Sequence, residues 1–192
     1  MHRKLMKLLT IPAVLLISVG LWGCNDSTDP ISPLLRGAEE STILFSVVGQ
    51  SYRVIKDGTS SYEKVSFVIG PDDSGDLHIG SHTLSVPEGA VTEPTVFTMV
   101  KPYGKDLEFS LSATRTDSTG AVIDVGARGF HAPVTLTASF EKVSMNLDRS
   151  LVIAWLRPDG LIEVQETRID TASKAASADL WHFSEYVIAT PF

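Results

Sequence analysis

Cysteine is almost absent from this chain of 192 residues, because Cys24 is the only one. A single thiol cannot form an intramolecular disulfide or supply the several thiolates of a cysteine-based zinc site. Enzyme motifs are missing too: the sequence has no nucleophile elbow, phosphate loop, zinc-protease helix or dinucleotide fingerprint. The acidic residues are scattered rather than paired as in glycosidases. We therefore expect a protein that is not a conventional enzyme and that uses no cofactor.

Basic residues are also scarce. The chain has 16 Lys and Arg against 23 Asp and Glu, which gives a formal net charge of −7. Beyond the first seven residues, no stretch of the chain gathers its basic residues into a cluster. Phosphate binding requires clustered Lys and Arg, so the composition argues against a nucleic-acid partner. It also argues against electrostatic docking on anionic lipid.

The first residues follow the three-part plan of a secretory signal. Arg3, Lys4 and Lys7 form a basic start, an apolar stretch covers 8–21, and a small residue precedes Cys24. The apolar stretch has 14 residues, whereas a membrane-spanning helix needs about 20. The pattern favours an exported protein. An ordinary signal peptide or a single membrane anchor is the alternative to a lipidated one.

The sequence Leu-Trp-Gly-Cys that ends at Cys24 resembles the lipobox of bacterial lipoproteins. The resemblance implies that residues 1–23 are removed and that Cys24 carries acyl chains such as palmitate. Two chains already anchor a protein stably in a membrane. Removal of the signal takes away three basic residues and no acid, so the net charge falls from −7 to −10. Asn25, rather than Asp, follows the cysteine, which favours the outer membrane over the inner one.

Residues 24–40 have the composition of a flexible tether. They include Pro30, Pro33 and Gly37 and show no sustained hydrophobic period. A tether of about 16 residues spans on the order of 20–25 Å, enough to hold a domain clear of lipid head groups. We expect the folded domain to cover 41–192.

From residue 43 onward the chain reads as short strands separated by turns. Apolar and polar residues alternate over 63–69, 107–113 and 134–140, which is typical of half-buried antiparallel strands. In the first of these, Phe67 belongs to the face expected to be buried. Residues 151–156 are apolar on both faces, which indicates a central strand. Phe109, Leu136 and Trp155 are expected in the core.

Turn signals separate these strands at regular intervals. They lie at 70–72, 80–81, 87–89, 118–120 and 158–160. Residues 172–178 have a helix-friendly composition but read better as a loop or hairpin turn. The sequence therefore predicts an all-β protein, a single antiparallel β-sandwich domain.

Three segments resemble the ZU-five domain of ankyrins, netrin receptors and zonula occludens proteins, which also occurs in bacterial surface lipoproteins. The segment 81–100, with Pro87, Gly89 and Ala90 in its centre, is similar to that family's L-x-(V/I)-P-x-G-A core. Residues 132–137 look like its PV-x-L-T strand, and 182–186, ending at Tyr186, like its closing strand. The resemblance spans about 62 to 190 and implies a β-sandwich used for binding.

The residues of the first segment also have a physical reading of their own. Pro87 ends a strand because it cannot donate a backbone hydrogen bond. Gly89 permits a positive φ that other side chains resist, and Ala90 is small enough to tuck under the turn. We expect these residues to form a corner of the fold rather than a binding site.

The run His182-Phe183-Ser184 raises the possibility of self-cleavage, because some members of the family cut between Phe and Ser in such a run. The Ser184 hydroxyl would attack the carbonyl of Phe183, with His182 as the base. We expect instead a plain closing strand, with Trp181 and Phe183 in the core. Tyr186 would lie on the other face and tie down a loop through its hydroxyl.

Metal binding is not expected. Asp72, Asp73 and Asp76 form an acidic loop whose spacing does not match a known calcium site, so it reads as a solvated turn. His78 and His82 flank a two-residue hairpin turn, which places the two imidazoles on opposite faces of the sheet.

Together these observations predict a lipid-anchored protein of the cell envelope with a binding or structural role, most simply through a protein partner. A self-processing module and a glycan- or wall-binding domain are the alternatives. Exposed aromatic residues would favour glycan, with Tyr52, Tyr62 and Tyr103 as candidates. A large exposed apolar patch would favour a protein partner.

Overall fold

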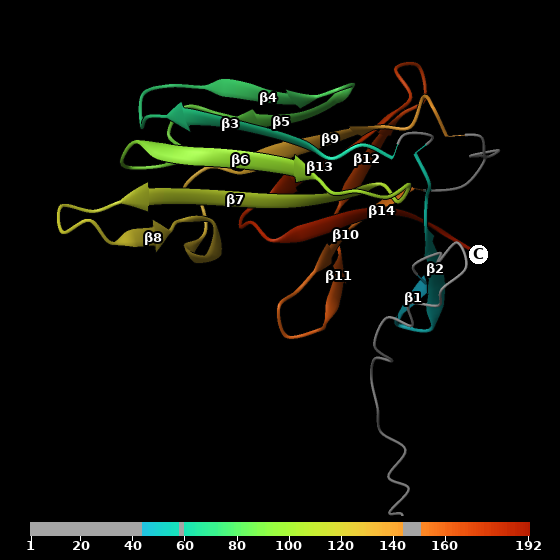
Figure 1. The fold of residues 1–192 in the computed structure, drawn as a ribbon. Coiled ribbons are helices and arrows are strands. Elements are labelled where there is room, and N and C mark those ends of the chain that lie inside the picture. The colour runs from blue at the N-terminus through green and yellow to red at the C-terminus, as the bar shows by residue number, and fades with distance from the viewer. Residues whose placement is uncertain (1–43, 58–59, 144–150) are drawn as a thin grey trace, which may run out of the picture. The chain divides into compact units, whose positions relative to one another are not determined.

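The computed structural model describes residues 44–57, 60–143 and 151–192 and is built from antiparallel β-strands (Figure 1). The only helical element in these ranges is the short 3-10 helix η1 (Gly126–Arg128). Within the same ranges, no helix is long and apolar enough to cross a membrane. The signal segment 1–23, Cys24 and the tether 24–40 lie outside the described residues.

The strands form two antiparallel sheets that pack face to face as a β-sandwich. The nine-stranded sheet contains β1 (Leu44–Val47), β2 (Gln50–Val54), β3 (Glu63–Ile69), β6 (Thr95–Lys101), β7 (Glu108–Thr116), β8 (Val122–Asp124), β10 (Val152–Leu156), β11 (Ile162–Val164) and β14 (Glu185–Pro191). The five-stranded sheet contains β4 (Gly75–Ile79), β5 (His82–Val86), β9 (Val134–Ser139), β12 (Thr167–Asp170) and β13 (Ala175–Leu180). The predicted all-β sandwich is thus confirmed.

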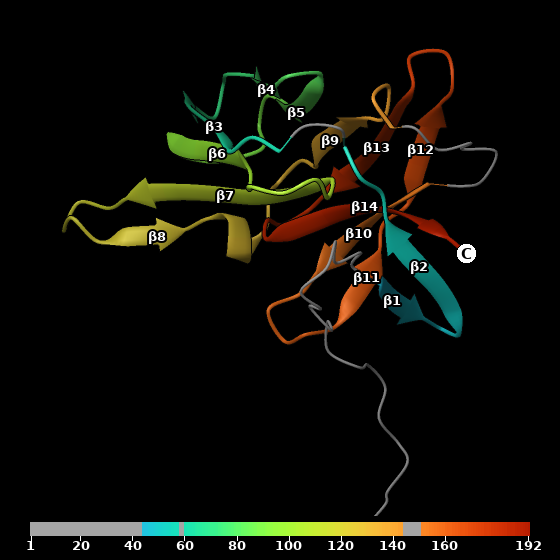
Figure 2. The ribbon, with the colours of Figure 1, turned by 45° about the vertical axis from the view of Figure 1, so that its right-hand side comes forward.

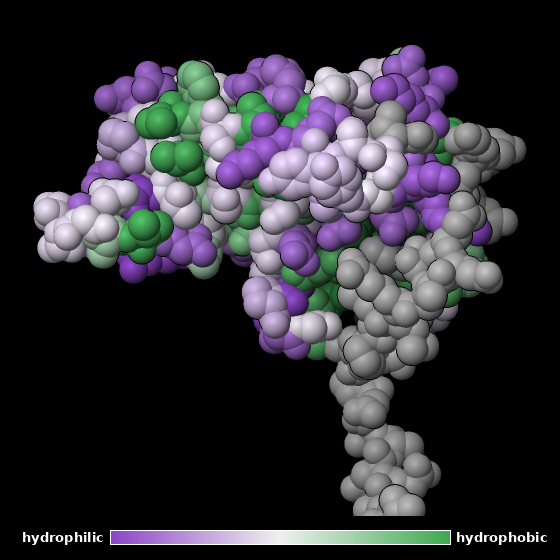
Figure 3. Space-filling model, in the orientation of Figure 1, coloured by the Kyte–Doolittle hydropathy of each residue, from purple (hydrophilic) through white to green (hydrophobic). Residues whose placement is uncertain are grey.

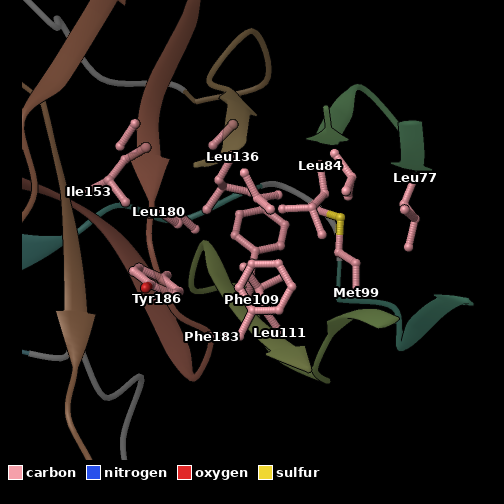
Figure 4. Packing of buried hydrophobic residues seen from close by; sticks show 14 of the residues in the cluster. Leu77, Leu84, Met99, Phe109, Leu111, Leu136, Ile153, Leu180, Phe183 and Tyr186 are labelled. Carbon is pink, nitrogen blue, oxygen red and sulfur yellow. The ribbon is translucent and has the colours of Figure 1, made fainter. Parts of the chain in front are cut away.

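The main core lies between the two sheets. Each strand turns its alternate apolar residues inward, so that β9 reads buried and half-buried in strict turn from Val134 to Ser139. Figure 4 shows how the two layers meet, with Leu84 and Leu136 from the smaller sheet and Met99 and Phe109 from the larger one. All four side chains are fully buried. The core predicted at Phe109 and Leu136 is confirmed.

A second, smaller core lies on the other face of β14. Tyr186 and Ile188 of this strand point into the main core, whereas Val187 and Ala189 point into the second one. The hairpins β1–β2 and β10–β11 supply the rest of the second core, and both lie on the side of β14 away from β4 and β5 (Figures 1 and 2). Burial on both faces explains why β14 is apolar along most of its length.

The sequence predictions for the central strand and for the turns hold. Strand β10 lies between β11 and β14 and contributes Ile153 to the main core and Ala154 to the second. Residues 171–174 form the turn between β12 and β13, but 175–178 belong to β13, so the prediction of a loop or hairpin turn over 172–178 is correct only for its first three residues. The two-residue turn at 80–81 closes the hairpin of β4 and β5, with Ile79 opposite His82.

Two predictions of burial are wrong. Phe67 is 57 % exposed, because β3 is an edge strand and the Phe67 ring lies beside Gly75, which has no side chain to cover it. Trp155 is only half-buried, because its indole lies at the margin of the main core. There it stacks on the His182 ring, with 3.7 Å between ring centroids.

Candidate functional site

The run His182-Phe183-Ser184 does not belong to the closing strand. Strand β14 begins at Glu185, and residues 181–184 form a bend before it. The backbone of this bend bonds to other segments: Phe130 N–H donates to Trp181 O at 2.9 Å, and Phe183 N–H donates to Gly126 O at 3.0 Å. These bonds turn Phe183 into the core and leave Trp181 55 % exposed. The prediction that Trp181 fills the core is therefore wrong.

Tyr186 holds this bend in place. Its hydroxyl donates a hydrogen bond to the backbone carbonyl of His182 at 2.8 Å, while its ring is fully buried in the main core. A buried tyrosine that bonds back to the chain just upstream is a known corner device of β-sandwiches. Burial raises the pKa of the Tyr186 hydroxyl, and the nearby Glu163 charge adds to this. The hydroxyl is thus a permanent donor and ties down the bend, as expected. The predicted side of the ring is wrong, because Tyr186 shares the main core with Phe183 instead of lying on the other face.

The groups required for self-cleavage are not brought together. The His182 ring nitrogen lies 3.4 Å from the Tyr186 hydroxyl, and the ring stacks on Trp155. The Ser184 hydroxyl lies 3.5 Å from the carbonyl of Leu156. Among the described residues, His182 and Ser184 make no hydrogen bond to each other. In this arrangement, His182 is not placed to take the proton of the Ser184 hydroxyl.

The turn at Pro87 to Ala90 lies at a corner between the sheets. Gly89 has a φ of +76° and donates its N–H to Pro71 O at 2.8 Å. Ala90 is buried, and its carbonyl accepts a hydrogen bond from His131 N–H at 3.0 Å. The turn thus joins two other loops through its backbone. Glu88 is exposed, whereas Pro87 is half-buried and Ala90 is buried, so the three motif residues Pro87, Gly89 and Ala90 serve the turn itself, in keeping with a role in the fold.

Three titratable residues meet in the interior at one end of the sandwich. Lys101 Nζ lies 3.5 Å from Asp57 Oδ2, and His82 Nε2 lies 3.8 Å from the same oxygen. All three side chains are buried. Lys101 ends β6 and Asp57 follows β2 in the larger sheet, whereas His82 begins β5 in the smaller one. The cluster therefore places an imidazole of the smaller sheet beside a buried Lys101–Asp57 ion pair on the side of the larger one.

The environment of His82 fixes its proton. Its Nδ1 accepts a hydrogen bond from Ser139 N–H at 3.1 Å, so the proton of the neutral ring is on Nε2, toward Asp57. Burial lowers the pKa of His82, and the Asp57 carboxylate opposes this only in part. His82 is thus neutral near pH 7, with both ring nitrogens engaged. It cannot also serve as a base toward a substrate.

A small hollow opens beside this cluster, with Glu63 and Lys142 at its wall. Its volume is about 50 Å³, whereas pockets for small molecules measure about 300–1,000 Å³. A space of this size holds a few water molecules. The buried cluster thus serves as a structural link between sheets rather than as a ligand pocket.

Sequence reasoning missed this cluster, although a signal for it was present. His82 shares the face of Leu84 and Val86, and Lys101 shares the face of Phe97 and Met99, when each strand is read with a period of two. When a titratable residue continues the apolar face of a strand at its end, the pattern predicts that its side chain is buried and paired with another polar or charged group. Asp57 carried no such signal, because it follows its strand in an irregular segment.

Two of the three tyrosines considered for glycan binding lie together. The rings of Tyr62 and Tyr103 are 5.5 Å apart at an interplanar angle of 32°, and the residues are 48 % and 79 % exposed. Both come from the same end of the β3–β6 pair, where Glu63 is opposite Lys101. Tyr52 instead stacks on Phe45 in the β1–β2 hairpin. The structure thus forms an exposed pair, not a row of three.

Three exposed apolar side chains of two adjacent strands lie at the other end of the same pair. Phe67 and Val68 of β3 are 57 % and 58 % exposed, and Val96 of β6, directly opposite Val68, is 38 % exposed. We call these three residues the β3 edge surface. Figure 3 shows apolar surface over this end of β3 and β6.

The residues weighed as metal ligands do not converge. His78 Nδ1 lies 3.0 Å from the Thr83 hydroxyl on the exposed face of the sheet, whereas His82 is buried. The two imidazoles thus lie on opposite faces, as predicted. Asp73 accepts a hydrogen bond from Gly70 N–H at 3.2 Å within its own turn. In the part of the chain that the structure describes, no three His, Cys, Asp or Glu side chains are grouped to hold a metal ion.

Comparison of the chain with protein-family models, with curated proteins and with solved structures gives no match.

Proposed function

We propose that this chain is a lipid-anchored protein of the bacterial cell envelope whose ZU-five-like β-sandwich binds another protein. The signal pattern of 1–23 and the lone Cys24 support the anchor, and Asn25 favours the outer membrane. The composition of 24–40 supports a tether between the anchor and the domain. With two acyl chains or more, the attachment would be stable.

The observation that carries the binding role is the β3 edge surface. Phe67 and Val68 lie on opposite faces of an edge strand and are both more than half exposed. Val96 extends the apolar surface to the next strand. Exposed apolar side chains that gather on one part of a surface, rather than scattering singly, are typical of protein interaction sites. A protein surface fits such a patch better than a sugar does, since it offers apolar side chains of its own.

The exposed Tyr62–Tyr103 pair favours a second candidate function, binding of cell-wall glycan. Aromatic rings present an apolar face to a sugar ring and a hydroxyl to its polar edge. The two rings are tilted by 32° rather than coplanar. They would therefore contact neighbouring sugar units better than a single one.

Site-specific photo-crosslinking in intact envelopes tests the main proposal. A photoreactive phenylalanine analogue at position 67 is expected to give a discrete crosslinked species on illumination. The matched control carries the analogue at Thr119, an exposed turn residue outside the β3 edge surface, and should give none. Equal labelling at both positions would contradict a protein partner at β3. Co-sedimentation with isolated wall glycan, lost in Tyr103→Ala, would support the second function instead.

A further inference from the structure

The free side of β3 is open to another strand. In the part of the chain that the structure describes, β3 is the last strand of its sheet and pairs only with β6, over all seven of its residues. Among the described residues, no backbone hydrogen bond joins Glu63–Ile69 to any segment other than β6. The N–H and C=O groups on the other side of β3 thus form a row that can pair with an added strand.

β3 lacks the usual features that protect an edge strand. Natural edges are blocked by proline, by bulges or by charged residues along the strand. Residues 63–69 contain no proline, and their register with β6 is unbroken. The charged residues Glu63 and Lys64 stand at its start, and Val-Ser-Phe-Val-Ile follows. The half of β3 that carries the exposed Phe67 and Val68 is therefore suited to pairing.

The exposed charged side chains at the two ends of β3 have opposite signs. Lys64 is exposed near the start of the strand, and the exposed Asp72 and Asp73 lie in the turn just after its end. In an antiparallel pair of two such strands, the start of each lies beside the end of the other. Lys64 of each copy then faces the acidic turn of its partner. This arrangement is complementary only when the added strand runs antiparallel.

We propose that the occupant of this edge is a second copy of the chain, paired antiparallel through β3 about a twofold axis at Phe67. This register places Phe67 opposite Phe67, Ser66 opposite Val68, and Lys64 opposite Gly70, next to the acidic turn. It covers the exposed Phe67 and Val68 of both copies at once. A twofold contact uses the same patch on each copy, so the patch must be complementary to itself. An edge strand with a positive and a negative end meets this condition when two copies run antiparallel.

The proposal names the partner for the β3 edge surface and so rests on the proposed binding function. In addition, it joins two nine-stranded sheets into one continuous sheet across the dimer. The outer face of β3 and β6, where the Ser66 and Thr98 hydroxyls lie 2.8 Å apart, would extend over both copies.

Cysteine crosslinking of the full chain in isolated envelopes tests this register. Directly opposed residues of an antiparallel pair have Cα atoms about 4.5–5.5 Å apart, within the range of a disulfide. Phe67→Cys lies on the axis and is expected to give a disulfide-linked dimer under mild oxidation. The dimer yield should be at least about tenfold that of two controls. The first control is Thr119→Cys, and the second is the unsubstituted chain, which shows any crosslinking through Cys24. A yield no higher than these controls overturns the proposal.

Charge reversal gives an independent test. Lys64→Asp, added to Phe67→Cys, is expected to lower the dimer yield several-fold. Further substitution of Asp72→Lys and Asp73→Lys should restore it. Val68→Lys should abolish the dimer, whereas the matched Val122→Lys on the exposed strand β8 should not. Loss without rescue by the charge swap would overturn the antiparallel register. Equal thermal unfolding of the variants shows that they remain folded.

The two proposals fail in different ways. Photo-crosslinking at position 67 to a species of another mass, with no disulfide dimer, would refute the second copy and keep the binding function. Absence of both products would refute both proposals.

Discussion

The ring of His82 accepts a hydrogen bond from the backbone N–H of Ser139, 57 residues away in sequence. β5 and β9 are already paired from Thr83 to Ser85, and this contact continues the link beyond the end of their ladder. The other ring nitrogen faces Asp57, which belongs to the opposite sheet. A neutral His82 thus connects two strands and two layers.

Stability is expected to decrease in mild acid because of this residue. Burial lowers the pKa of His82 below the usual value of 6.5, so the folded state binds fewer protons than the unfolded state. The stabilisation is complete above pH 6.5 and is lost as the pH falls through the lowered pKa of the folded state. The free energy of unfolding in urea should be higher at pH 7.5 than at pH 5.

His82→Gln should reduce this dependence on pH, while the exposed His78→Gln should leave it unchanged. Part of the dependence should remain, because burial also lowers the pKa of His182. An unaltered pH profile in His82→Gln would exclude His82 as the source.

Loss of the Tyr186 hydroxyl should destabilise the fold without a change in packing. Tyr186→Phe keeps the ring in the core but removes the donor to the His182 carbonyl. Leaving a buried carbonyl without its partner costs about 1–3 kcal/mol. Urea unfolding should show this loss, and Tyr103→Phe, at an exposed ring, should change stability by less than about 0.5 kcal/mol. A neutral Tyr186→Phe would show that the hydroxyl does not hold the bend.

Truncation in the core should separate buried from exposed apolar residues. Leu136 is fully buried between the sheets, so Leu136→Ala should cost about 2–5 kcal/mol. Phe67→Ala should cost less than about 1 kcal/mol, because the side chain is already largely in water. Both are measured by chemical unfolding of the monomeric protein at low concentration. Similar losses for the two variants would contradict the position of β3 at the edge.

Membrane attachment is expected to depend on Cys24. Cys24→Ala should move the protein from the detergent-requiring membrane fraction to the soluble exported fraction, as followed by fractionation and immunoblot. Mass spectrometry of the mature protein should find an acylated Cys24 with no residue before it. If Cys24→Ala still requires detergent for release, the lipoprotein interpretation is wrong.

Self-cleavage at Phe183 is not expected, since the structure places His182 against Trp155 and Tyr186 rather than against Ser184. Intact mass after denaturation should show a single species that ends at Phe192. Denaturation matters because hydrogen bonds of β14 would hold a cleaved peptide in place. A peptide that begins at Ser184, and is absent in Ser184→Ala, would establish the self-processing alternative.

Alternation of apolar and polar residues predicted several strands of the main core, but not the start of β13, whose residues 175–178 were expected in a loop or hairpin turn. It placed Phe109 and Leu136 correctly, because each contacts neighbours on the inner face of a central strand. The hairpin at 80–81 was equally predictable, since its turn residues and the alternation of the residues on either side both indicate a two-residue turn. These features depend on residues close together in sequence.

Features that depend on contacts between residues far apart in the sequence could not be predicted in this way. Phe67 has the period of a buried residue, but its exposure follows from the position of β3 at the sheet edge. In a regular strand Trp181 would lie on the same face as the core residue Phe183. Backbone hydrogen bonds of Trp181 with Phe130 and of Phe183 with Gly126 instead hold this segment in a bend. The second core escaped prediction because it joins residues from both ends of the domain.

The position of β14 has a consequence for the time at which the chain can fold. Among the described residues, β10 pairs only with β11 and β14, and β2 pairs only with β1 and β14. Both strands emerge from the ribosome before residues 185–191, so the second core and the middle of the larger sheet cannot be completed until β14 has followed them. If the chain is exported as we propose, this order of strands favours passage through a secretion channel that accepts only extended chains.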